Sequence, residues 1–298
     1  MRADAHPRPW DGVRDAAEHG PTAPQDPYFG ALGDLLGSVE IPGEDILTVD
    51  VWAPAGAAQA GGALPVVVWY HGGALERGTP ALPAYDGTTF ARDRVVFVSI
   101  AYRVGAEGFS VLEGAPRNLG LCDAAAGLVW VQREIARFGG DPARITIVGE
   151  SAGGELVAAL LARPDTAAIP VAAVIQSGPL EAVAPERAPA VRLAAARTAP
   201  TYVYEPAWRS PVRDLRAAHA IDIGFVFDRI EAPDSQLVVG ADAPRELAGR
   251  MHGDWVQVAR TGDPGWPRYG AGREGQVYDV TSRVTPLRRA AAVDSLPG

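Results

Sequence analysis

The stretch ITIVGESAGGELVAALL, residues 145–161, decides the fold. Four strand-type residues run into Gly149-Glu150-Ser151-Ala152-Gly153, and a helix-forming segment follows at once. A G-x-S-x-G sequence between a strand and a helix is typical of a sharp turn that lifts a serine hydroxyl above the edge of a sheet. The glycines two positions before and after the serine remove Cβ atoms that would clash in the crowded turn. The stretch predicts that Ser151 is a nucleophile; the alternative is a tight turn with an incidental serine.

A second glycine-rich turn follows the apolar segment 66–69, where the sequence reads His71-Gly72-Gly73-Ala74. A motif of this type after a strand supplies backbone amides to an oxyanion hole. We expect the amides of Gly73 and Ala74 to join that of Ala152, at the start of the helix after the serine, because a helix N-terminus favours developing negative charge. His71 itself is predicted to be structural. The alternative is a plain glycine turn.

The general base is expected to be a histidine that follows the serine in the chain. Only His219 and His252 meet this condition. His219 lies in a loop before the apolar segment IDIGFVF, whereas His252 lies inside an apparent amphipathic helix and is interpreted as a surface or packing residue. The sequence therefore favours His219. Asp222, three residues further on, is interpreted as structural.

Predicted strands and helices alternate along the chain. Continuous apolar segments at 66–69 and 94–105 predict strands covered on both faces of a parallel sheet. A helix is predicted where apolar residues recur every three or four positions, at Leu121, Ala124, Leu128, Val131, Ile135 and Phe138. Gly139 and Gly140 should end it, with a turn at 141–142. Further strands are predicted at 46–54, 170–178 and 201–208, and further helices at 186–199 and 244–261. This order predicts a three-layer α/β fold with a mostly parallel sheet, as a single domain of residues 1–298.

Composition narrows the class of protein. The chain has 298 residues and a net charge of −9, with 36 acidic and 27 basic residues. This balance argues against binding to a nucleic-acid backbone. One cysteine, Cys122, permits no internal disulfide and no cysteine-based metal site. Because no apolar run spans a bilayer and the start lacks the apolar core of a signal peptide, we expect a cytoplasmic protein without a membrane partner. No metal or cofactor is implied, and the oligomeric state is not indicated.

Many segments together resemble the type-B carboxylesterases, the family of the cholinesterases and the bacterial para-nitrobenzyl esterases. The resemblance covers most of residues 9–270 and implies an α/β-hydrolase fold and hydrolysis of carboxylic esters. The segments, in the family's order, are PWDGVRDAAEHGPTAPQ, EDILTVDVWAP, PVVVWYHGGA, YDGTTFA, VSIAYRVGAEGF, NLGLCDAAAGLVWVQREIARFGGDPARITIVGESAGG, VIQSG, WRSP, AAHAIDIGFVFD and HGDWVQVARTGDPGWPRY. By the same resemblance the roles of nucleophile, base and oxyanion donors fall on Ser151, His219, Gly73, Ala74 and Ala152.

The chain departs from the family pattern in two places. It begins inside the pattern, so we expect it to be shortened at the N-terminus, and Ile46 stands where many members carry a disulfide cysteine. It is also shortened between VIQSG and TYVYEPAWRSP, where members carry a sheet strand and the glutamate that completes the catalytic triad. Only 68 positions separate Ser151 from His219. A replacement acid is expected near the carboxyl ends of the strands. Glu181 is the first candidate, Glu205 the second, and no acid the third possibility.

These features predict a serine carboxylesterase that acts on small, apolar esters through an acyl-enzyme. The missing wall of the site predicts a more open pocket that tolerates bulky esters. One alternative is a catalytically weak or inactive esterase-like scaffold that lacks the triad acid. Another is a peptidase or amidase with the same fold, since the serine turn does not distinguish esters from amides.

Overall fold

A five-stranded sheet forms the centre of the molecule. The structure is a computed structural model, and it describes residues 10–114, 116–177 and 199–287. The strand order is β1-β3-β2-β4-β5. β2 pairs in parallel with β3 and β4, and β4 with β5, whereas β1 joins β3 antiparallel at the edge. The strands are β1 (Val49–Trp52), β2 (Leu64–Tyr70), β3 (Val96–Ile100), β4 (Gly140–Glu150) and β5 (Ala172–Gln176).

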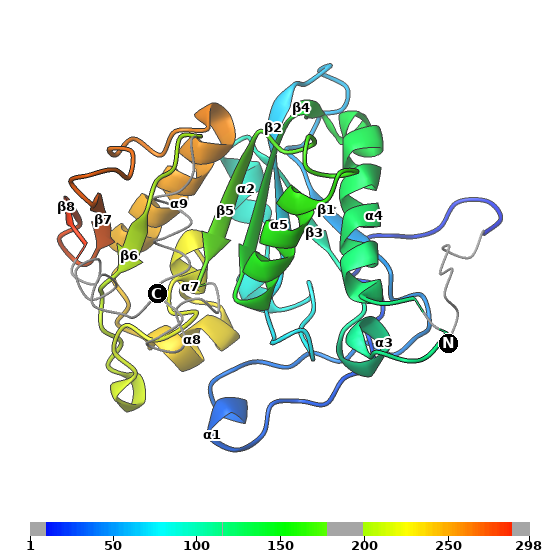
Figure 1. The fold of residues 1–298 in the computed structure, drawn as a ribbon, viewed down its shortest axis with the longest axis horizontal. Coiled ribbons are helices and arrows are strands. Elements are labelled where there is room, and N and C mark those ends of the chain that lie inside the picture. The colour runs from blue at the N-terminus through cyan, green and yellow to red at the C-terminus, as the bar shows by residue number, and fades with distance from the viewer. Residues whose placement is uncertain (1–9, 115, 178–198, 288–298) are drawn as a thin grey trace.

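Helices connect these strands and cover both faces of the sheet (Figure 1). The α-helices with described bounds are α1 (Gly30–Gly33), α2 (Thr88–Arg92), α3 (Gly105–Phe109), α4 (Leu119–Glu134), α5 (Ala152–Ala162), α7 (Ile223–Val226), α8 (Pro233–Val239) and α9 (Arg245–Thr261). Short 3-10 turns occur at η1 (Pro83–Tyr85), η2 (Ile135–Phe138) and η4 (Val212–Asp214).

Strand β2 shows why the sequence reads as a continuous apolar run. Val66, Val68 and Tyr70 point into one apolar core, whereas Val67 and Trp69 point into another on the opposite face. Successive side chains of a strand alternate between faces, so a strand buried on both sides needs apolar residues at every position. Both predicted central strands are therefore confirmed.

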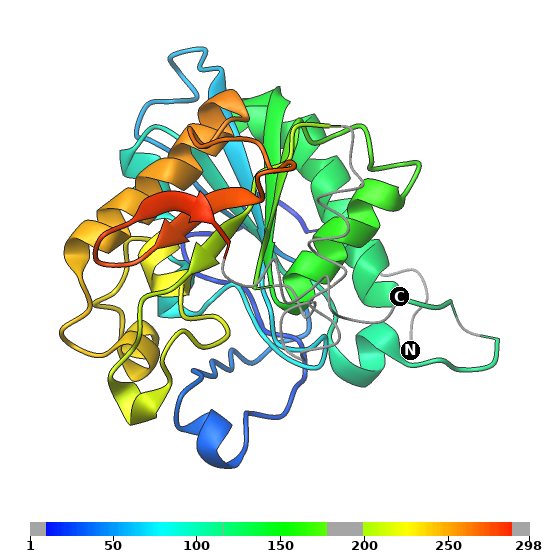
Figure 2. The same ribbon diagram turned by 60° about the vertical axis from the view of Figure 1, so that its left-hand side comes forward.

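Each core pairs the sheet with its own helices. The first core lies between the sheet and helices α4 and α5, which contribute Ala124, Leu128, Val131, Leu156, Val157 and Leu160. The second core lies between the other face and helices α2, α7 and α9, which contribute Phe90, Phe225, Val226, Met251 and Trp255. Figure 2 shows α9 on one side of the sheet and α4 and α5 on the other. This is the three-layer α/β fold that the sequence predicts.

A second, smaller sheet is the feature that the sequence does not predict. It has the order β6-β7-β8, with β6 (Tyr204–Pro206), β7 (Glu274–Tyr278) and β8 (Arg283–Pro286). β6 pairs in parallel with β7, and β7 antiparallel with β8. The expected strand at 201–208 is thus present but short, and its hydrogen-bonded neighbour is β7, not β5. Residues 186–198 of the helix predicted at 186–199 lie outside the described residues.

Two predictions at the end of α4 are wrong in detail. The chain tightens into the 3-10 turn η2 after Glu134, which changes the rotation per residue and leaves Phe138 exposed although Ile135 is buried. The expected turn at 141–142 lies inside β4, which starts at Gly140 and pairs irregularly with β2 between Leu64 and Val66.

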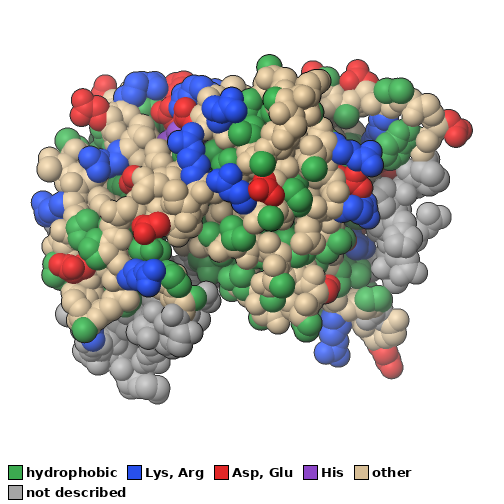
Figure 3. Space-filling view, turned by 90° about the horizontal axis from the view of Figure 1, so that it is seen from above, with side chains coloured by type: hydrophobic (Ala, Val, Ile, Leu, Met, Phe, Trp, Pro, Cys, Tyr) green, Lys and Arg blue, Asp and Glu red, His purple; other side chains and the backbone are tan. Residues whose placement is uncertain are grey.

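The surface shown in Figure 3 carries charges of both signs. Arginine and acidic side chains are interspersed there, with apolar side chains between them. The basic side chains are all arginine, because the sequence contains no lysine. In the part of the chain that the structure describes, no helix is both long and apolar enough to cross a bilayer.

Candidate active site

Ser151 occupies a strained turn between β4 and α5. Its backbone has φ 53° and ψ −123°, a conformation that costs free energy for a residue with a side chain. A Cβ atom at Gly149 would lie 2.1 Å from the carbonyl oxygen of Gly153, and one at Gly153 would lie 2.0 Å from that of Tyr70. The predicted reason for both glycines is confirmed, since any side chain there would force the turn apart.

The structure brings Ser151 and His219 together. Ser151 Oγ lies 2.9 Å from His219 Nε2, so the hydroxyl can donate a hydrogen bond to the ring. His219 lies in the turn before α7 and is partly exposed, whereas Ser151 is the residue that precedes helix α5. Partial burial lowers the pKa of His219, and the charge of Asp222 opposes this effect. A neutral imidazole beside a serine hydroxyl is the arrangement that general-base activation requires.

The turn after β2 offers backbone amides near this serine. Gly73 and Ala74 have φ values of +116° and +59°. Among the described residues, no hydrogen bond engages either amide. Ala152 is the first residue of α5, and amides in the first helical turn have no partner within the helix. The β2 and β4 registers place Tyr70 opposite Gly149, so both turns leave the same end of the sheet.

His71 has a structural environment. The ring is buried and stacks on Tyr102, with 4.3 Å between ring centroids. Its Nδ1 lies 2.8 Å from the carbonyl oxygen of Gly72, and the Tyr102 hydroxyl donates to the His71 carbonyl oxygen at 2.6 Å. Burial lowers the pKa of His71 to about 4, so the ring is neutral near pH 7.

Glu150, the residue before the serine, is a buried carboxyl next to His219. Its Oε1 lies 3.3 Å from His219 Nε2 but makes no hydrogen bond. Burial, and to a smaller degree the charge of Asp222, raises the pKa of Glu150 well above its usual range. A Cβ atom at Gly72 would lie 2.3 Å from Glu150 Oε2, so a glycine there makes room for the carboxyl.

Asp222 is the second buried carboxyl near His219. It accepts hydrogen bonds from the Ser177 hydroxyl at 3.3 Å and the Tyr204 hydroxyl at 3.0 Å. The Ala220 amide donates to the same Ser177 oxygen at 3.3 Å. Ser177 follows β5 and Tyr204 lies in β6, so Asp222 joins both sheets to the turn that carries His219. Burial raises the pKa of Asp222, although its hydrogen bonds act in the opposite direction.

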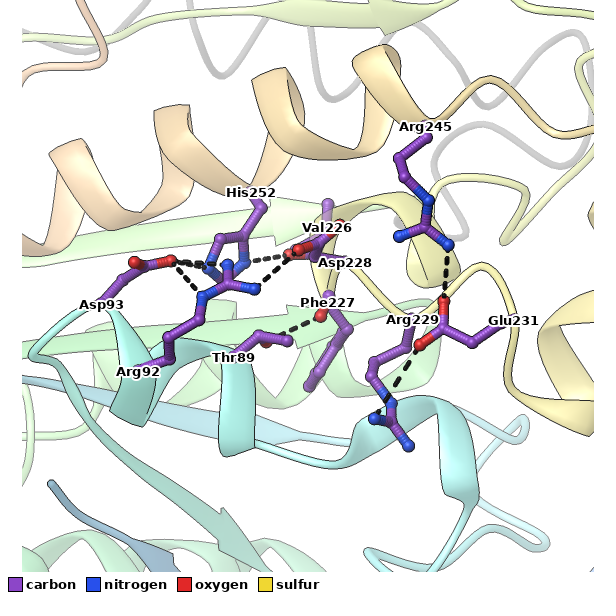
Figure 4. Close-up of polar contacts among 10 residues, drawn as sticks. All are labelled: Thr89, Arg92, Asp93, Val226, Phe227, Asp228, Arg229, Glu231, Arg245 and His252. Carbon is purple, nitrogen blue, oxygen red and sulfur yellow. Dashed lines mark hydrogen bonds and ion pairs between the residues drawn. The ribbon is translucent and has the colours of Figure 1, made fainter. Parts of the chain in front are cut away.

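A network on the far side of α7 anchors this turn (Figure 4). His252 of α9 approaches the Val226 carbonyl oxygen through Nδ1 at 2.9 Å and Asp93 Oδ2 through Nε2 at 3.0 Å. The Thr89 hydroxyl of α2 donates to the Phe227 carbonyl oxygen at 2.7 Å. His252 is buried, so of the two sequence interpretations the packing role applies, and it holds the helix that follows His219.

The expected third member of the site has no described position. Glu181 lies outside the described residues, and Glu205 lies in β6. The described residues place no hydrogen-bond partner on His219 Nδ1. Sequence reasoning missed Glu150, because it occupies the variable position of the serine motif. The signal for Asp222 was available, since a carboxylate inside the apolar run IDIGFVF is expected to be buried and paired. No group of three or more metal-ligating side chains occurs within the described ranges.

Comparisons with known proteins agree with this architecture. The family model described as "Carboxylesterase family" matches residues 2–192, more than half of the chain. The chain is 43% identical over 173 residues to a phenmedipham hydrolase of Pseudarthrobacter oxydans, covering 57% of this chain and 34% of that protein. It is 40% identical over 197 residues to the para-nitrobenzyl esterase of Bacillus subtilis, covering 63% and 38%. The chain thus spans about a third of the length of these relatives.

Solved structures show the same fold. A structure titled as a thermophilic PNB esterase superposes with a TM-score of 0.83 at 23% identity, over 96% of this chain and 90% of that one. A carboxylesterase of Geobacillus stearothermophilus superposes with a TM-score of 0.77 at 25% identity, over 97% and 90%. The predicted resemblance to type-B carboxylesterases and the predicted α/β-hydrolase fold are confirmed. The family match ends at residue 192, so the placement of His219 rests on geometry.

Proposed function

Because the chain belongs to the carboxylesterase family, we propose that it hydrolyses carboxylic esters with Ser151 as nucleophile and His219 as base. The contact of 2.9 Å between Ser151 Oγ and His219 Nε2, at a strained serine turn, carries this proposal. Ser151 Oγ attacks the ester carbonyl carbon while its proton passes to Nε2. The tetrahedral intermediate then collapses, and the alcohol leaves with that proton. Water, deprotonated by His219, releases the acid from the acyl-serine.

The amides of Gly73, Ala74 and Ala152 are proposed to stabilise the oxyanion. Two observations support this role: the first two amides have no acceptor among the described residues, and the third begins a helix. Donors that are fixed before the reaction lower the barrier without reorganisation, and one such donor accounts for about 10²- to 10³-fold in kcat.

Two carboxylates are the candidates that we propose for the third member of the triad. Glu181 keeps the role that the sequence assigns to it, and Asp222 is a further source of negative charge near His219. A carboxylate on Nδ1 fixes the tautomer of the base, and replacing it with an amide costs about 10⁴-fold in kcat in a serine protease. Comparing Glu181→Gln with Asp222→Asn would show which carboxylate supports the base.

The first experiment measures hydrolysis of p-nitrophenyl butyrate by the protein and by Ser151→Ala. We expect turnover in the wild type and a loss of about 10³-fold or more in the variant, because the nucleophile is gone. A Cys122→Ala variant should retain full turnover, since this exposed thiol belongs to a different element. Equal rates for the wild type and Ser151→Ala would overturn the proposal.

A catalytically weak scaffold is the second candidate, and one observation favours it. His219 Nδ1 has no hydrogen-bond partner among the described residues, so the base lacks an evident orienting group. Labelling with a fluorophosphonate separates the two candidates. Stoichiometric labelling of Ser151, absent in Ser151→Ala, would support the esterase, whereas an unlabelled serine in folded protein would support the scaffold.

The substrates are proposed to be small, apolar esters, in a site open enough for bulky ones. Support comes from the family and from the names of relatives such as the para-nitrobenzyl esterase. We expect kcat/KM to vary less than about tenfold from acetyl to octanoyl p-nitrophenyl esters, because an extra methylene in a closed pocket changes specificity by 10- to 200-fold. A sharp cut-off at one acyl length would show a closed pocket.

A further inference from the structure

The loop that carries the proposed oxyanion donors has positive φ values at four of its seven residues. In this loop, residues 72–78, the φ values are +116° at Gly73, +59° at Ala74, +61° at Leu75 and +112° at Gly78. Ala74 and Leu75 carry side chains, so the left-handed region costs them free energy. Such a conformation persists only where the surroundings fix it. The question is which residues outside the loop do so.

Gln25 forms hydrogen bonds with both backbone groups of one loop residue, the amide and the carbonyl oxygen of Gly78. The Gly78 amide donates to Gln25 Oε1 at 2.7 Å, and Gln25 Nε2 donates to the Gly78 carbonyl oxygen at 3.0 Å. Nε2 also donates to the Ala23 carbonyl oxygen at 3.1 Å, which orients the side chain. The amide group of Gln25 thus pairs with Gly78 as the backbone of a neighbouring strand would.

Fixing Gly78 fixes the start of the loop as well. A Cβ atom at Gly78 would lie 2.3 Å from the Gly72 carbonyl oxygen and 2.4 Å from His71 Nδ1. The end of the loop is therefore packed directly on its beginning. Inside the loop, the Gly73 carbonyl oxygen accepts hydrogen bonds from the amides of Glu76 and Arg77, both at 3.0 Å. A shift of Gly78 would be passed to the residues that carry the proposed donors.

Three further contacts hold the described loop, but none of them pairs with both the amide and the carbonyl of one residue. The Gly105 amide donates to the Leu75 carbonyl oxygen at 2.6 Å. Arg77 donates to the Pro27 carbonyl oxygen at 3.3 Å and lies over the Tyr28 ring, 4.9 Å from its centroid. The segment 25–28 is thus attached to the loop, and Gln25 supplies the shortest hydrogen bonds between the two, at 2.7 and 3.0 Å against 3.3 Å for Arg77.

We propose that Gln25 is a positioning residue for the oxyanion hole, acting through the backbone of Gly78. This inference rests on the proposed function and adds a residue distant in sequence from the serine turn. Gln25 touches no reacting atom. It holds the loop in the conformation in which the amides of Gly73 and Ala74 are available to the oxyanion.

The test compares Gln25→Ala and Gln25→Glu with Thr22→Val. Thr22 lies in the same segment, and its hydroxyl pairs with Ile41 at 3.1 and 3.4 Å without contacting the loop, so it is the matched control. We expect kcat per fluorophosphonate-titrated site to fall roughly 10- to 100-fold in both Gln25 variants, with little change in KM. Affinity for a trifluoromethyl ketone, which forms an oxyanion on the serine, should fall in parallel. Thr22→Val should lower the melting temperature but keep kcat per site.

Hydrogen exchange of the peptide that contains residues 72–78 gives a readout independent of catalysis. Exchange should accelerate in Gln25→Ala and stay at the wild-type rate in Thr22→Val. Unchanged exchange, or unchanged kcat per site and unchanged ketone affinity, would overturn the inference. Wild-type protein without turnover would overturn the proposed function and the catalytic part of this inference together, and the exchange rates would then show separately whether Gln25 holds the loop.

Discussion

At the scale of single residues, the site depends on glycines whose missing side chains leave room for neighbouring groups. Gly149 and Gly153 allow the sharp turn at Ser151, and Gly72 leaves room for the carboxyl of Glu150. The result places two buried carboxyls, Glu150 and Asp222, close to one histidine. Burial raises the pKa of both carboxyls, and the charge of Asp222 raises the pKa of His219.

The pH profile of kcat/KM should reflect this difference. The pKa of His219 is lowered by burial, so the base stays neutral and active at pH values below the ordinary histidine pKa of about 6.5. We expect the acid limb of the profile to have its midpoint below that value. Asp222→Asn removes the charge that raises the pKa of His219 and should move the limb to lower pH still, with a lower maximum rate.

Glu150→Gln is the matched control for this prediction. It replaces the buried carboxyl, whose pKa burial raises, with an amide of the same shape, and the charge that acts on the pKa of His219 is that of Asp222, so the acid limb should keep its wild-type position. A limb that moves to higher pH in Asp222→Asn, or that moves equally in both variants, would contradict the electrostatic assignment. The measurement is kcat/KM for p-nitrophenyl butyrate from pH 4.5 to 8.

Residues within sequence motifs were predictable, and residues that act from outside them were not. The motif around Ser151 fixes its own turn, because its glycines are needed locally. His219 was identified from chain order and its loop context, and the structure places it 2.9 Å from Ser151 Oγ. Gln25 and Glu150 carry no local signal, since their neighbours in space are remote in sequence or contribute only backbone atoms.

At the scale of elements, the position of His219 depends on the short helix α7. Four residues cannot form a stable helix alone, so tertiary contacts must hold it. Those contacts come from His252 of α9, Thr89 of α2 and the hydroxyls that bind Asp222. Helix α7 therefore lies between the sheet and α9 and is held by contacts with both. Its sequence predicts only that it is apolar.

Replacing His252 should destabilise the fold. His252→Ala leaves the Val226 carbonyl oxygen without its partner and opens a cavity beside Phe90, so we expect a loss of roughly 2 kcal/mol in the free energy of unfolding. For a chain of 298 residues that lowers the melting temperature by roughly 3 °C. The measurements are thermal unfolding followed by circular dichroism, and kcat per titrated site, which should stay within about threefold.

Arg245→Ala is the control variant for His252→Ala, and the melting temperatures of the two are compared. Arg245 and Glu231 form an exposed ion pair at 3.5 Å (Figure 4), and such pairs contribute about 0–1 kcal/mol. Its melting temperature should therefore lie near that of the wild type. If both variants unfold at the wild-type temperature, His252 does not anchor α7.

At the scale of the whole molecule, the sequence predicted layers better than connections. Alternation of apolar side chains along β2 and the periodicity of α4 identify which faces are buried, because burial patterns are local. The pairing of β6 with β7 was not predictable, since it joins segments about 70 residues apart and depends on which edge each strand reaches. The acid of the triad stays a prediction for the same reason: its place depends on the route of the chain after β5.

The two cores on opposite faces of the sheet have a consequence for how the protein is assayed. Ser151 leads into α5 in the first core, and His219 leads into α7 in the second. Neither half alone holds both atoms of the contact between serine and histidine. The fraction of chains in which Ser151 reacts therefore measures the fraction in which both cores are folded. A partly folded chain, even one with much helix, would not react at Ser151.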